Sequence, residues 1–263
     1  MLSGLDIALF EAANQMVGRS FTLDALMALA MEDPLVKGGP LAACFLFAWW
    51  ARADEATQAR RRGTLLVTLA TLFAIAPLMK IVSTGTDMSP RPLVMAEQVV
   101  LYQNGAFEAA PLVAYTPPAT GLAARLAADA REGRVAGNDL ASFPSDHAAL
   151  FVAFAAGIFL AMRGAGLVAL GWTVFGILLP RVATGMHWPS DMAAGALAGL
   201  AILAGAYLLA RGPARRFVKG AVALADRHRA WAQAALFLLL VEAASAMETL
   251  QRLVDLALGI VAR

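Results

Sequence analysis

The chain has 263 residues, of which 60% are hydrophobic and 15% are charged, and its formal net charge is +2. Soluble domains are about 45–50% apolar, so this composition excludes an ordinary soluble protein and indicates an integral membrane protein with one domain. Basic and acidic residues are interspersed over most of the chain, a balance that gives no sign of nucleic-acid binding.

The first twenty residues predict a helix and not a cleaved signal. They contain Asp6 and Glu11, and they lack a basic leader followed by an unbroken apolar core. Apolar residues recur at helical spacing from Leu5 to Val17. Such a helix fits either the plane of the lipid headgroups or a position against its own bundle.

Several later segments are apolar enough to cross a bilayer, for which about 20 residues are needed. An apolar helix near 21–31 leads into the first of them. Glycine and alanine within the segments suit close helix packing in lipid, as in Gly195 to Gly199. The predicted spans are 35–50, 64–79, 148–162, 166–179, 192–210 and 230–246. We therefore expect an all-α bundle of five to six spans with interfacial helices.

Basic residues follow alternate spans and predict the orientation of the bundle. They are Arg60, Arg61 and Arg62 after the first span, Arg163 after the third, and Arg211, Arg215, Arg216 and Lys219 after the fifth. Alternating crossings place these turns on one side, which the positive-inside rule makes cytoplasmic. We expect a bacterial inner-membrane protein whose other face lies toward the periplasm or the cell exterior.

The connection over about 84–143 is too long for a simple turn and is expected on the outward face. Thr120 is positioned to cap a short helix over 121–132 that Gly133 closes. This loop is predicted as a lid, a specificity loop or a plain insertion.

The composition changes after residue 211. A basic amphipathic segment suits the anionic inner leaflet, and a last apolar run follows it. Glu242 interrupts that run and is expected to be paired or to reach the membrane surface. We expect a membrane domain over 1–211 and a separate segment over 212–263.

Three short polar clusters lie at the ends of apolar runs. They are Arg91-Pro92, Pro144-Ser145-Asp146-His147, and Arg181 with His187 and Asp191. Two of the three histidines in the chain fall within these clusters, and the pKa of histidine suits proton transfer near neutral pH. The predicted topology places all three clusters on the outward face.

The third cluster has the pattern of a nucleophile and a residue that orients it. His187 and Asp191 are four residues apart at a helix start favoured by Pro189, so their side chains can meet. Asp191 can accept a hydrogen bond from one imidazole nitrogen and leave the other nitrogen to attack phosphorus. Arg181 offers a planar fork for phosphoryl oxygens. Trp188 is interpreted as an aromatic anchor at the membrane surface.

The second cluster begins a span, where free backbone N–H groups favour an anion. Ser145 can add its hydroxyl, and His147 is suited to protonate a leaving oxygen. The two histidines with Asp146 and Asp191 also match metal ligands by type. The nearby arginines would repel a cation and attract a phosphate, so we expect no metal and no other cofactor.

Together, the three clusters resemble the signature motifs of the type 2 phosphatidic acid phosphatase superfamily over roughly residues 1–211. The segment 142–147, with Leu9-Phe10, Asn14 and Leu23-Asp24, looks most like the bacterial undecaprenyl-diphosphate phosphatases of the bacitracin-resistance type. Other members of the superfamily act on phosphatidylglycerophosphate, lipid A or sphingoid phosphates.

The resemblance implies a metal-independent double displacement. His187 would be phosphorylated, Asp191 would orient it, and His147 would act as general acid and then help to activate water. The phosphate would be held by Arg91, Arg181 and Ser145.

The first motif departs from the family pattern. In many members a lysine stands seven positions before the arginine, where this chain has Thr84, and Lys80 lies one helical turn earlier. Lys80 either reaches the phosphate by its long stem or extends to the membrane surface.

The expected function is therefore hydrolysis of undecaprenyl diphosphate to undecaprenyl phosphate, with the lipid phosphate or diphosphate and the bilayer as partners. One alternative is a phosphotransferase that passes the phosphoryl group to a lipid or glycan acceptor. Another is a transporter or scaffold that binds lipid phosphate without turnover, although the sequence shows no inverted repeat. The oligomeric state is left open.

Overall fold

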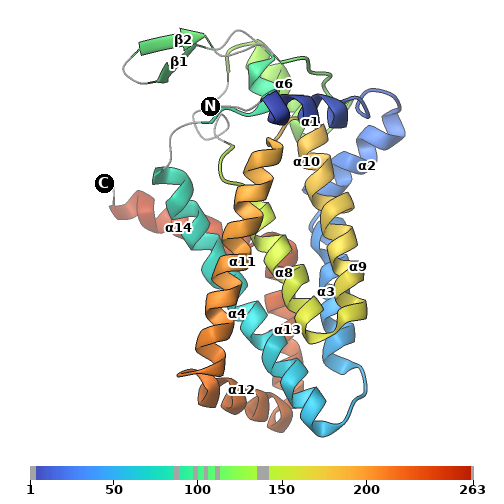
Figure 1. Cartoon of the computed structure of the whole chain (residues 1–263), viewed down its shortest axis with the longest axis vertical. Helices are drawn as coiled ribbons and strands as arrows, with labels where there is room; N and C mark the ends of the chain where they lie inside the picture. The colour runs from blue at the N-terminus through green and yellow to red at the C-terminus, as the bar shows by residue number, and fades with distance from the viewer. Residues whose placement is uncertain are drawn as a thin grey trace.

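The computed structural model describes residues 4–85, 89–96, 100–103, 106–109, 113–134 and 142–261, and its long helices run side by side along one axis (Figure 1). The helices are α1 (Gly4–Asn14), α2 (Phe21–Glu32), α3 (Pro34–Trp50), α4 (Glu55–Gly85), α5 (Pro92–Met95), α6 (Leu122–Arg131), α8 (Asp146–Ala161), α9 (Arg163–Trp172), the π-helical η1 (Thr173–Leu178), α10 (Leu179–Ala183), α11 (Pro189–Arg211), α12 (Arg215–Arg227), α13 (Arg229–Ala244) and α14 (Glu248–Val261). The strands β1 (Val100–Gln103) and β2 (Ala106–Ala109) pair antiparallel, with Val100 opposite Ala109.

Three helical segments of the described chain are long and apolar enough to cross a membrane. They are Glu55–Ser83, Arg163–Ala183 and Pro189–Arg211. The middle one joins α9, η1 and α10 without a break, and α8 is apolar but shorter. The helical membrane fold is thus confirmed in outline, whereas the predicted five to six spans stay a prediction. The short strand pair β1–β2 was not predicted.

Helix α8 lies at the centre of the bundle, packed against α4, α9 and α11. Its contact with α11 is close because glycines of α11 lie against the backbone of α8. A Cβ atom at Gly195 would stand 2.1 Å from the carbonyl oxygen of Ser145, and one at Gly199 would stand 2.1 Å from that of Ala149. Small residues of this kind let helix backbones approach in lipid. The first turns of α8 and α11 are therefore neighbours, which brings the second polar cluster next to Asp191 of the third.

The two ends of the bundle differ (Figure 1). The turns α3–α4, α8–α9 and α11–α12 lie toward the lower end, where α12 runs across the bundle. Helices α1 and α6 and the strand pair lie at the upper end. The basic turns thus share one end, as predicted, while their assignment to the cytoplasm stays a prediction.

Helix α1 packs across the upper end of the bundle, where it contacts α10 and α11. The buried amide of Asn14 donates to the carbonyl oxygens of Thr116 (2.9 Å) and Ala183 (2.8 Å) and accepts from the Thr116 N–H (2.7 Å). The carboxylate of Asp24 accepts from the backbone N–H groups of Gly18 and Ala119. These side chains fasten the segment 113–119 to the bundle.

The predicted short helix near 121–132 is present as α6, but its capping differs from the prediction. Gly121 is the N-cap residue at φ 91°, and Glu32 of α2 accepts from the Leu122 N–H at 2.6 Å. Glu32 also pairs with Arg125 at 3.2 Å. A carboxylate from a distant helix therefore takes the role expected of Thr120. Five parts of the predicted outward loop lie outside the described residues, namely 86–88, 97–99, 104–105, 110–112 and 135–141.

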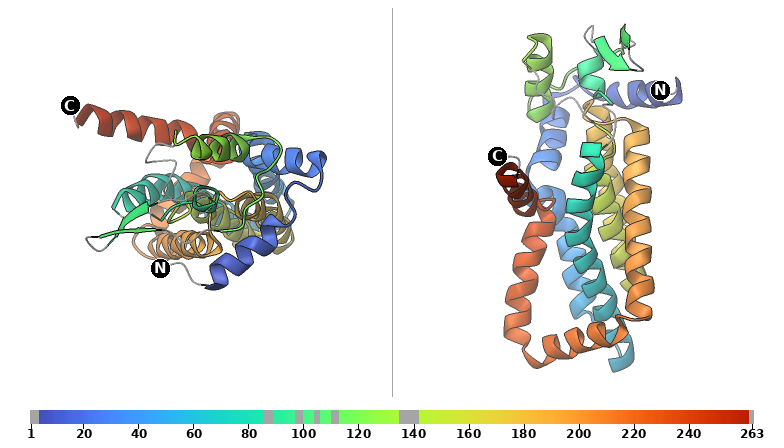
Figure 2. Two further views of the ribbon diagram at one scale, coloured as in Figure 1. Left: turned by 90° about the horizontal axis from the view of Figure 1, so that it is seen from above. Right: turned by 90° about the vertical axis from the view of Figure 1, so that its left-hand side faces the viewer.

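The C-terminal helices return along the bundle and then turn across it (Figure 2). Helix α13 crosses α3 at Gly38, where a Cβ atom would stand 2.2 Å from the Cα of Ala244. Ala246 (φ 59°) and Met247 (φ 62°) then form a buried left-handed turn, a conformation that costs about 1–3 kcal/mol at each such residue. Glu242 is paired here, because its Oε1 accepts from the Leu250 N–H at 2.8 Å. The division of the chain near residue 211 stays a prediction.

Candidate active site

A cavity of about 520 Å³ brings together side chains from the three polar clusters. Arg91, His147, Arg181 and His187 all line it, and so does Lys80 at the end of α4. Ser145 and Asp191 are not among the described residues that line it. The predicted site residues thus divide into a group at the cavity and a pair behind its wall.

The turn between α10 and α11 explains the spacing from Arg181 to His187. The carbonyl oxygen of Arg181 accepts from the N–H groups of Met186 (3.0 Å) and His187 (3.3 Å), and Gly185 between them has φ +77°. A glycine in the left-handed region after the last helical turn is the usual way to close a helix. The closure brings the side chains of Arg181 and His187 to one cavity.

Arg91 reaches the cavity because its loop is held against this turn. The Leu93 N–H donates to the carbonyl oxygen of Gly185 at 3.0 Å, and Nε1 of Trp188 donates to that of Pro90 at 2.9 Å. Nη1 of Arg91 then donates to the carbonyl oxygen of Met186 at 3.4 Å. These contacts join the first cluster to the third across about a hundred residues of sequence.

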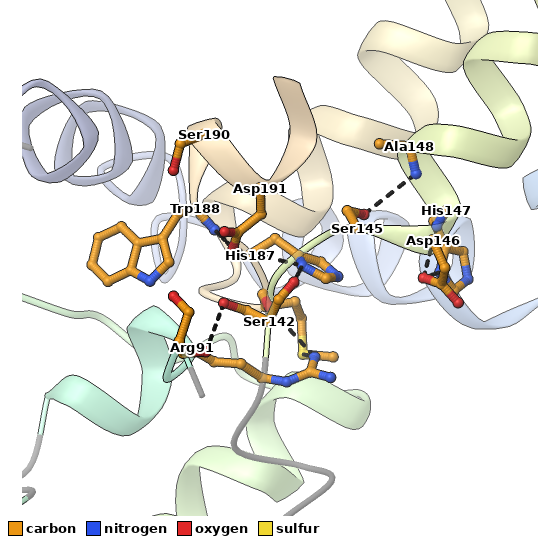
Figure 3. A network of polar contacts seen from close by, with 12 residues as sticks. Arg91, Ser142, Ser145, Asp146, His147, Ala148, His187, Trp188, Ser190 and Asp191 are labelled. Atoms are coloured by element: carbon orange, nitrogen blue, oxygen red, sulfur yellow. Dashed lines mark hydrogen bonds and ion pairs between the residues drawn. The ribbon is translucent and has the colours of Figure 1, made fainter. Parts of the chain in front are cut away.

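His187 is 7% exposed, and its ring is oriented by the backbone (Figure 3). Nδ1 lies 2.9 Å from the carbonyl oxygen of Ser142. Because a carbonyl oxygen only accepts, Nδ1 carries the hydrogen and Nε2 keeps its lone pair. Ser142 is itself fixed, since its N–H (2.8 Å) and its hydroxyl (3.0 Å) both donate to the carbonyl oxygen of Ser89.

The hydrogen-bond partner of Asp191 differs from the predicted one. Its Oδ2 accepts from the Trp188 N–H at 2.9 Å and lies 3.9 Å from Nδ1 of His187, which is too long for a hydrogen bond. The prediction that Asp191 accepts from the imidazole is therefore wrong in this structure. An acidic side chain at the third helical position binds the free N–H at the start of its own helix, and Ser142 takes the contact with the ring. Asp191 still lies near enough to act on His187 through its charge.

His147 has a carboxylate partner that we did not assign from the sequence. Its Nδ1 lies 2.8 Å from Oδ1 of Asp146, the preceding residue, at the start of α8. An ionised carboxylate only accepts, so Nδ1 carries the hydrogen and Nε2 remains for a substrate. Burial and the charge of Arg181 lower the pKa of His147, and the Asp146 carboxylate opposes this shift by favouring the protonated imidazole that a general acid needs.

Ser145 lies behind the cavity as a helix cap. It is fully buried, its hydroxyl accepts from the Ala148 N–H at 3.3 Å, and its own N–H donates to the carbonyl oxygen of Asp191 at 3.2 Å. The structure does not bring its hydroxyl to the cavity, in contrast to the predicted phosphate contact. The bond to Asp191 directly joins the second cluster to the third.

The two arginines give the cavity a positive electrostatic character. Arg181 is 6% exposed, and its Nη1 has no hydrogen-bond partner among the described residues, so this N–H group can donate to an oxyanion. Burial, with the charges of Arg91 and Arg181, lowers the pKa of His187 to about 3. The ring is therefore neutral at physiological pH, the form in which Nε2 is a nucleophile.

Trp188 does not face the membrane surface, so its interpretation as an interfacial anchor is wrong. It is fully buried and packs edge-on against Phe10 of α1 at 5.4 Å between ring centroids. Its N–H groups hold Pro90 and Asp191, as described above. The sequence carried no sign that α1 covers this position.

Lys37, Glu248 and Gln251 also line the cavity, and we did not single them out from the sequence. Lys37 belongs to α3, and the other two belong to α14, far from the clusters in the chain. The sequence feature that could have identified Lys37 is that it is a lysine inside an apolar run. Within the described part of the chain, no three His, Cys, Asp or Glu side chains form a group suited to a metal ion.

Comparison with known proteins matches part of the chain to one family. No curated protein and no solved structure matched. The matched region contains the second and third clusters, whereas Lys80, Arg91 and nearly all of the C-terminal segment lie outside it. Residues 97–214 match the family model of the PAP2 superfamily.

Proposed function

We propose that this protein is a membrane lipid phosphatase that hydrolyses undecaprenyl diphosphate to undecaprenyl phosphate through a phosphohistidine. The observation that carries the proposal is that Arg91, Arg181, His147 and His187 line one cavity. Two guanidinium groups beside two imidazoles suit a phosphoryl group that is bound, transferred and released. The family match supports the more general part of this proposal, that the protein hydrolyses a phosphate ester.

In the first proposed step, Nε2 of His187 attacks the terminal phosphorus of the lipid diphosphate. The bond between that phosphorus and the bridging oxygen breaks, and His147 donates its proton to this oxygen. Arg91 and Arg181 bind the phosphoryl oxygens, whose charge they offset as the group moves. The products are lipid monophosphate and a phosphohistidine at 187.

In the second step, His147, now neutral, accepts a proton from water, and the water oxygen bonds to phosphorus. The bond between phosphorus and Nε2 of His187 breaks, which restores the imidazole and releases inorganic phosphate. Asp191 and the Ser142 carbonyl oxygen stabilise the ring while it carries the phosphoryl group. We propose that this chemistry takes place on the outward face of a bacterial inner membrane.

The test uses the purified full-length protein in vesicles with undecaprenyl diphosphate as the sole substrate. We expect inorganic phosphate to be released, and His187→Ala to abolish the release while lipid binding persists. His228→Ala is the matched control, because His228 lies between α12 and α13, away from the cavity.

Persistent release from His187→Ala would refute the phosphohistidine. Release only after a second lipid or a glycan is added would replace hydrolysis by phosphotransfer. Binding without release under every condition would indicate a transporter or scaffold.

A further inference from the structure

Lys37 places a buried positive charge on the cavity wall. It lies far from all three polar clusters in the sequence. Its side chain is 3% exposed, and its Nζ lies 3.7 Å from Oε1 of Glu248, whose side chain is 47% exposed. Lysine is rarely buried without a partner, and this distance is longer than a charge-assisted hydrogen bond. The ammonium group is therefore loosely paired beside the cavity.

The charge of Lys37 acts on one side of the site. It interacts electrostatically with Asp146 and Arg181 and contributes to the field at His147. Arg91 contributes the largest charge at His187, whereas Asp146 and Arg181 act on both histidines. Lys37 is thus associated with the proposed general acid, and Arg91 with the proposed nucleophile.

These two sides of the site correspond to the two sides of phosphorus in an in-line displacement. The nucleophile approaches phosphorus on one side, and the leaving oxygen departs on the other. His147 protonates that oxygen in the proposed reaction, so the group attached to the oxygen lies beyond His147. In a lipid diphosphate, that group is the second phosphoryl group, which carries negative charge.

The C-terminal helix α14 completes this side of the cavity. Gln251 donates to Oδ2 of Asp146 at 3.4 Å, and Glu248 faces Lys37. The close crossing at Gly38, one residue after Lys37, and the left-handed turn at Ala246 set α14 in this position. A segment outside the family match therefore contributes to the site.

We propose that Lys37 binds the leaving phosphoryl group of a diphosphate substrate, and that this group replaces Glu248 beside the ammonium. The proposal rests on the proposed function, and it deepens it by giving the site a preference for diphosphates over monophosphates. Arg91 and Arg181 hold the transferred group, and Lys37 holds the group that stays on the lipid.

The experiment compares farnesyl diphosphate and farnesyl phosphate as substrates in the full-length protein. Loss of one charged contact corresponds to about 1.5–3 kcal/mol, so we expect Lys37→Met to lower kcat/KM for the diphosphate about ten- to a hundred-fold, mainly through KM. The kcat/KM for the monophosphate should fall less than about three-fold. The ratio of the two kcat/KM values is therefore the decisive measurement. Lys37→Arg should restore most of the loss, and Glu248→Gln should lower KM for the diphosphate.

Lys219→Met is the matched control, because Lys219 is exposed on α12 at the far end of the bundle. An equal fall for both substrates in Lys37→Met would show a structural role and overturn the proposal. A higher KM for the diphosphate in Glu248→Gln would overturn the proposal that the leaving phosphoryl group replaces Glu248 beside Lys37.

Equilibrium binding separates this proposal from the proposed function. Methylenediphosphonate should bind Lys37→Met more weakly than wild type, whereas orthophosphate should bind both equally. If the wild type releases no phosphate from undecaprenyl diphosphate, the proposed function fails, and this binding difference still decides the role of Lys37. Equal binding of methylenediphosphonate to both proteins would refute it.

Discussion

Nδ1 of His187 donates to the carbonyl oxygen of Ser142 at 2.9 Å, so the main chain and not a carboxylate sets the orientation of the ring. A backbone acceptor cannot titrate, and this one is held by two further bonds to the carbonyl oxygen of Ser89. Nε2 is therefore the nitrogen with the lone pair at every pH at which His187 is neutral.

The first prediction concerns the titration of His187. Its pKa in the folded protein is about 3, against about 6.5 in an unfolded chain, because the ring is buried beside Arg91 and Arg181. We expect its NMR signals to stay constant from pH 8 to pH 5, with the signal assigned through His187→Gln. A bound oxyanion such as tungstate offsets the two arginines and should raise the pKa. A midpoint near 6.5 without the anion would contradict the prediction.

The same pKa shift has a consequence for stability. As the pH falls below about 6.5, the unfolded chain takes up a proton at this histidine that the folded chain does not take up until about pH 3. His187 therefore makes the folded protein less stable as the pH falls through this range. His187→Gln should show a smaller loss of thermal stability between pH 7 and pH 5 than the wild type.

The second prediction separates two roles of Asp191. Asp191→Ala leaves the buried Trp188 N–H without its acceptor, which should lower the free energy of unfolding by about 1–3 kcal/mol, and it removes the charge near His187. Asp191→Asn keeps an acceptor oxygen, so thermal stability should be retained while kcat falls by about a hundred-fold or more. Equal activity of Asp191→Asn and wild type would exclude a role for the charge.

The third prediction tests the contact that joins the second and third clusters. Gly195→Ala would place a Cβ 2.1 Å from the Ser145 carbonyl oxygen, so α8 and α11 must separate. We expect a loss of about 1–3 kcal/mol in stability, with a fall in activity because His147 is displaced. Gly205→Ala on the same helix is the control, since no atom of a neighbouring helix lies within 4 Å of its Cβ position. Similar behaviour of the two variants would argue against the close contact.

The fourth prediction concerns the hydrogen bonds by which Asn14 holds the segment 113–119 against the bundle. Asn14→Ala removes a buried amide that makes three hydrogen bonds to main-chain groups, two of them to Thr116. Thermal unfolding should show a loss of about 1–3 kcal/mol, because those groups lose their partners. The neighbouring exposed Gln15 gives the control, Gln15→Ala, for which no change is expected. A stable Asn14→Ala variant would mean that the segment 113–119 is held by other contacts.

The fifth prediction concerns the class of chemistry. Vanadate adopts the five-coordinate geometry of a phosphoryl group in transfer, so it should inhibit competitively at Arg91 and Arg181. EDTA should leave phosphate release unchanged. Inactivation by EDTA that a divalent cation reverses would transfer the reaction to a metal-dependent mechanism.

The sequence by itself determined the helical character of the bundle and pointed to four of the residues that line the candidate site. Long apolar runs must satisfy their backbone hydrogen bonds internally within a bilayer, and so they form helices whatever their neighbours are. Arg91, Arg181, His147 and His187 were identified because charged and titratable residues at the ends of such runs are rare.

Only the tertiary structure decided which groups meet. Helical periodicity gives the face on which a side chain lies, but not the helix that packs against that face. The approach of α11 to α8 at Gly195, and of α13 to α3 at Gly38, depends on contacts between residues far apart in the chain. Those contacts bury Trp188, bring Lys37 to the cavity and give His187 a backbone partner in place of Asp191.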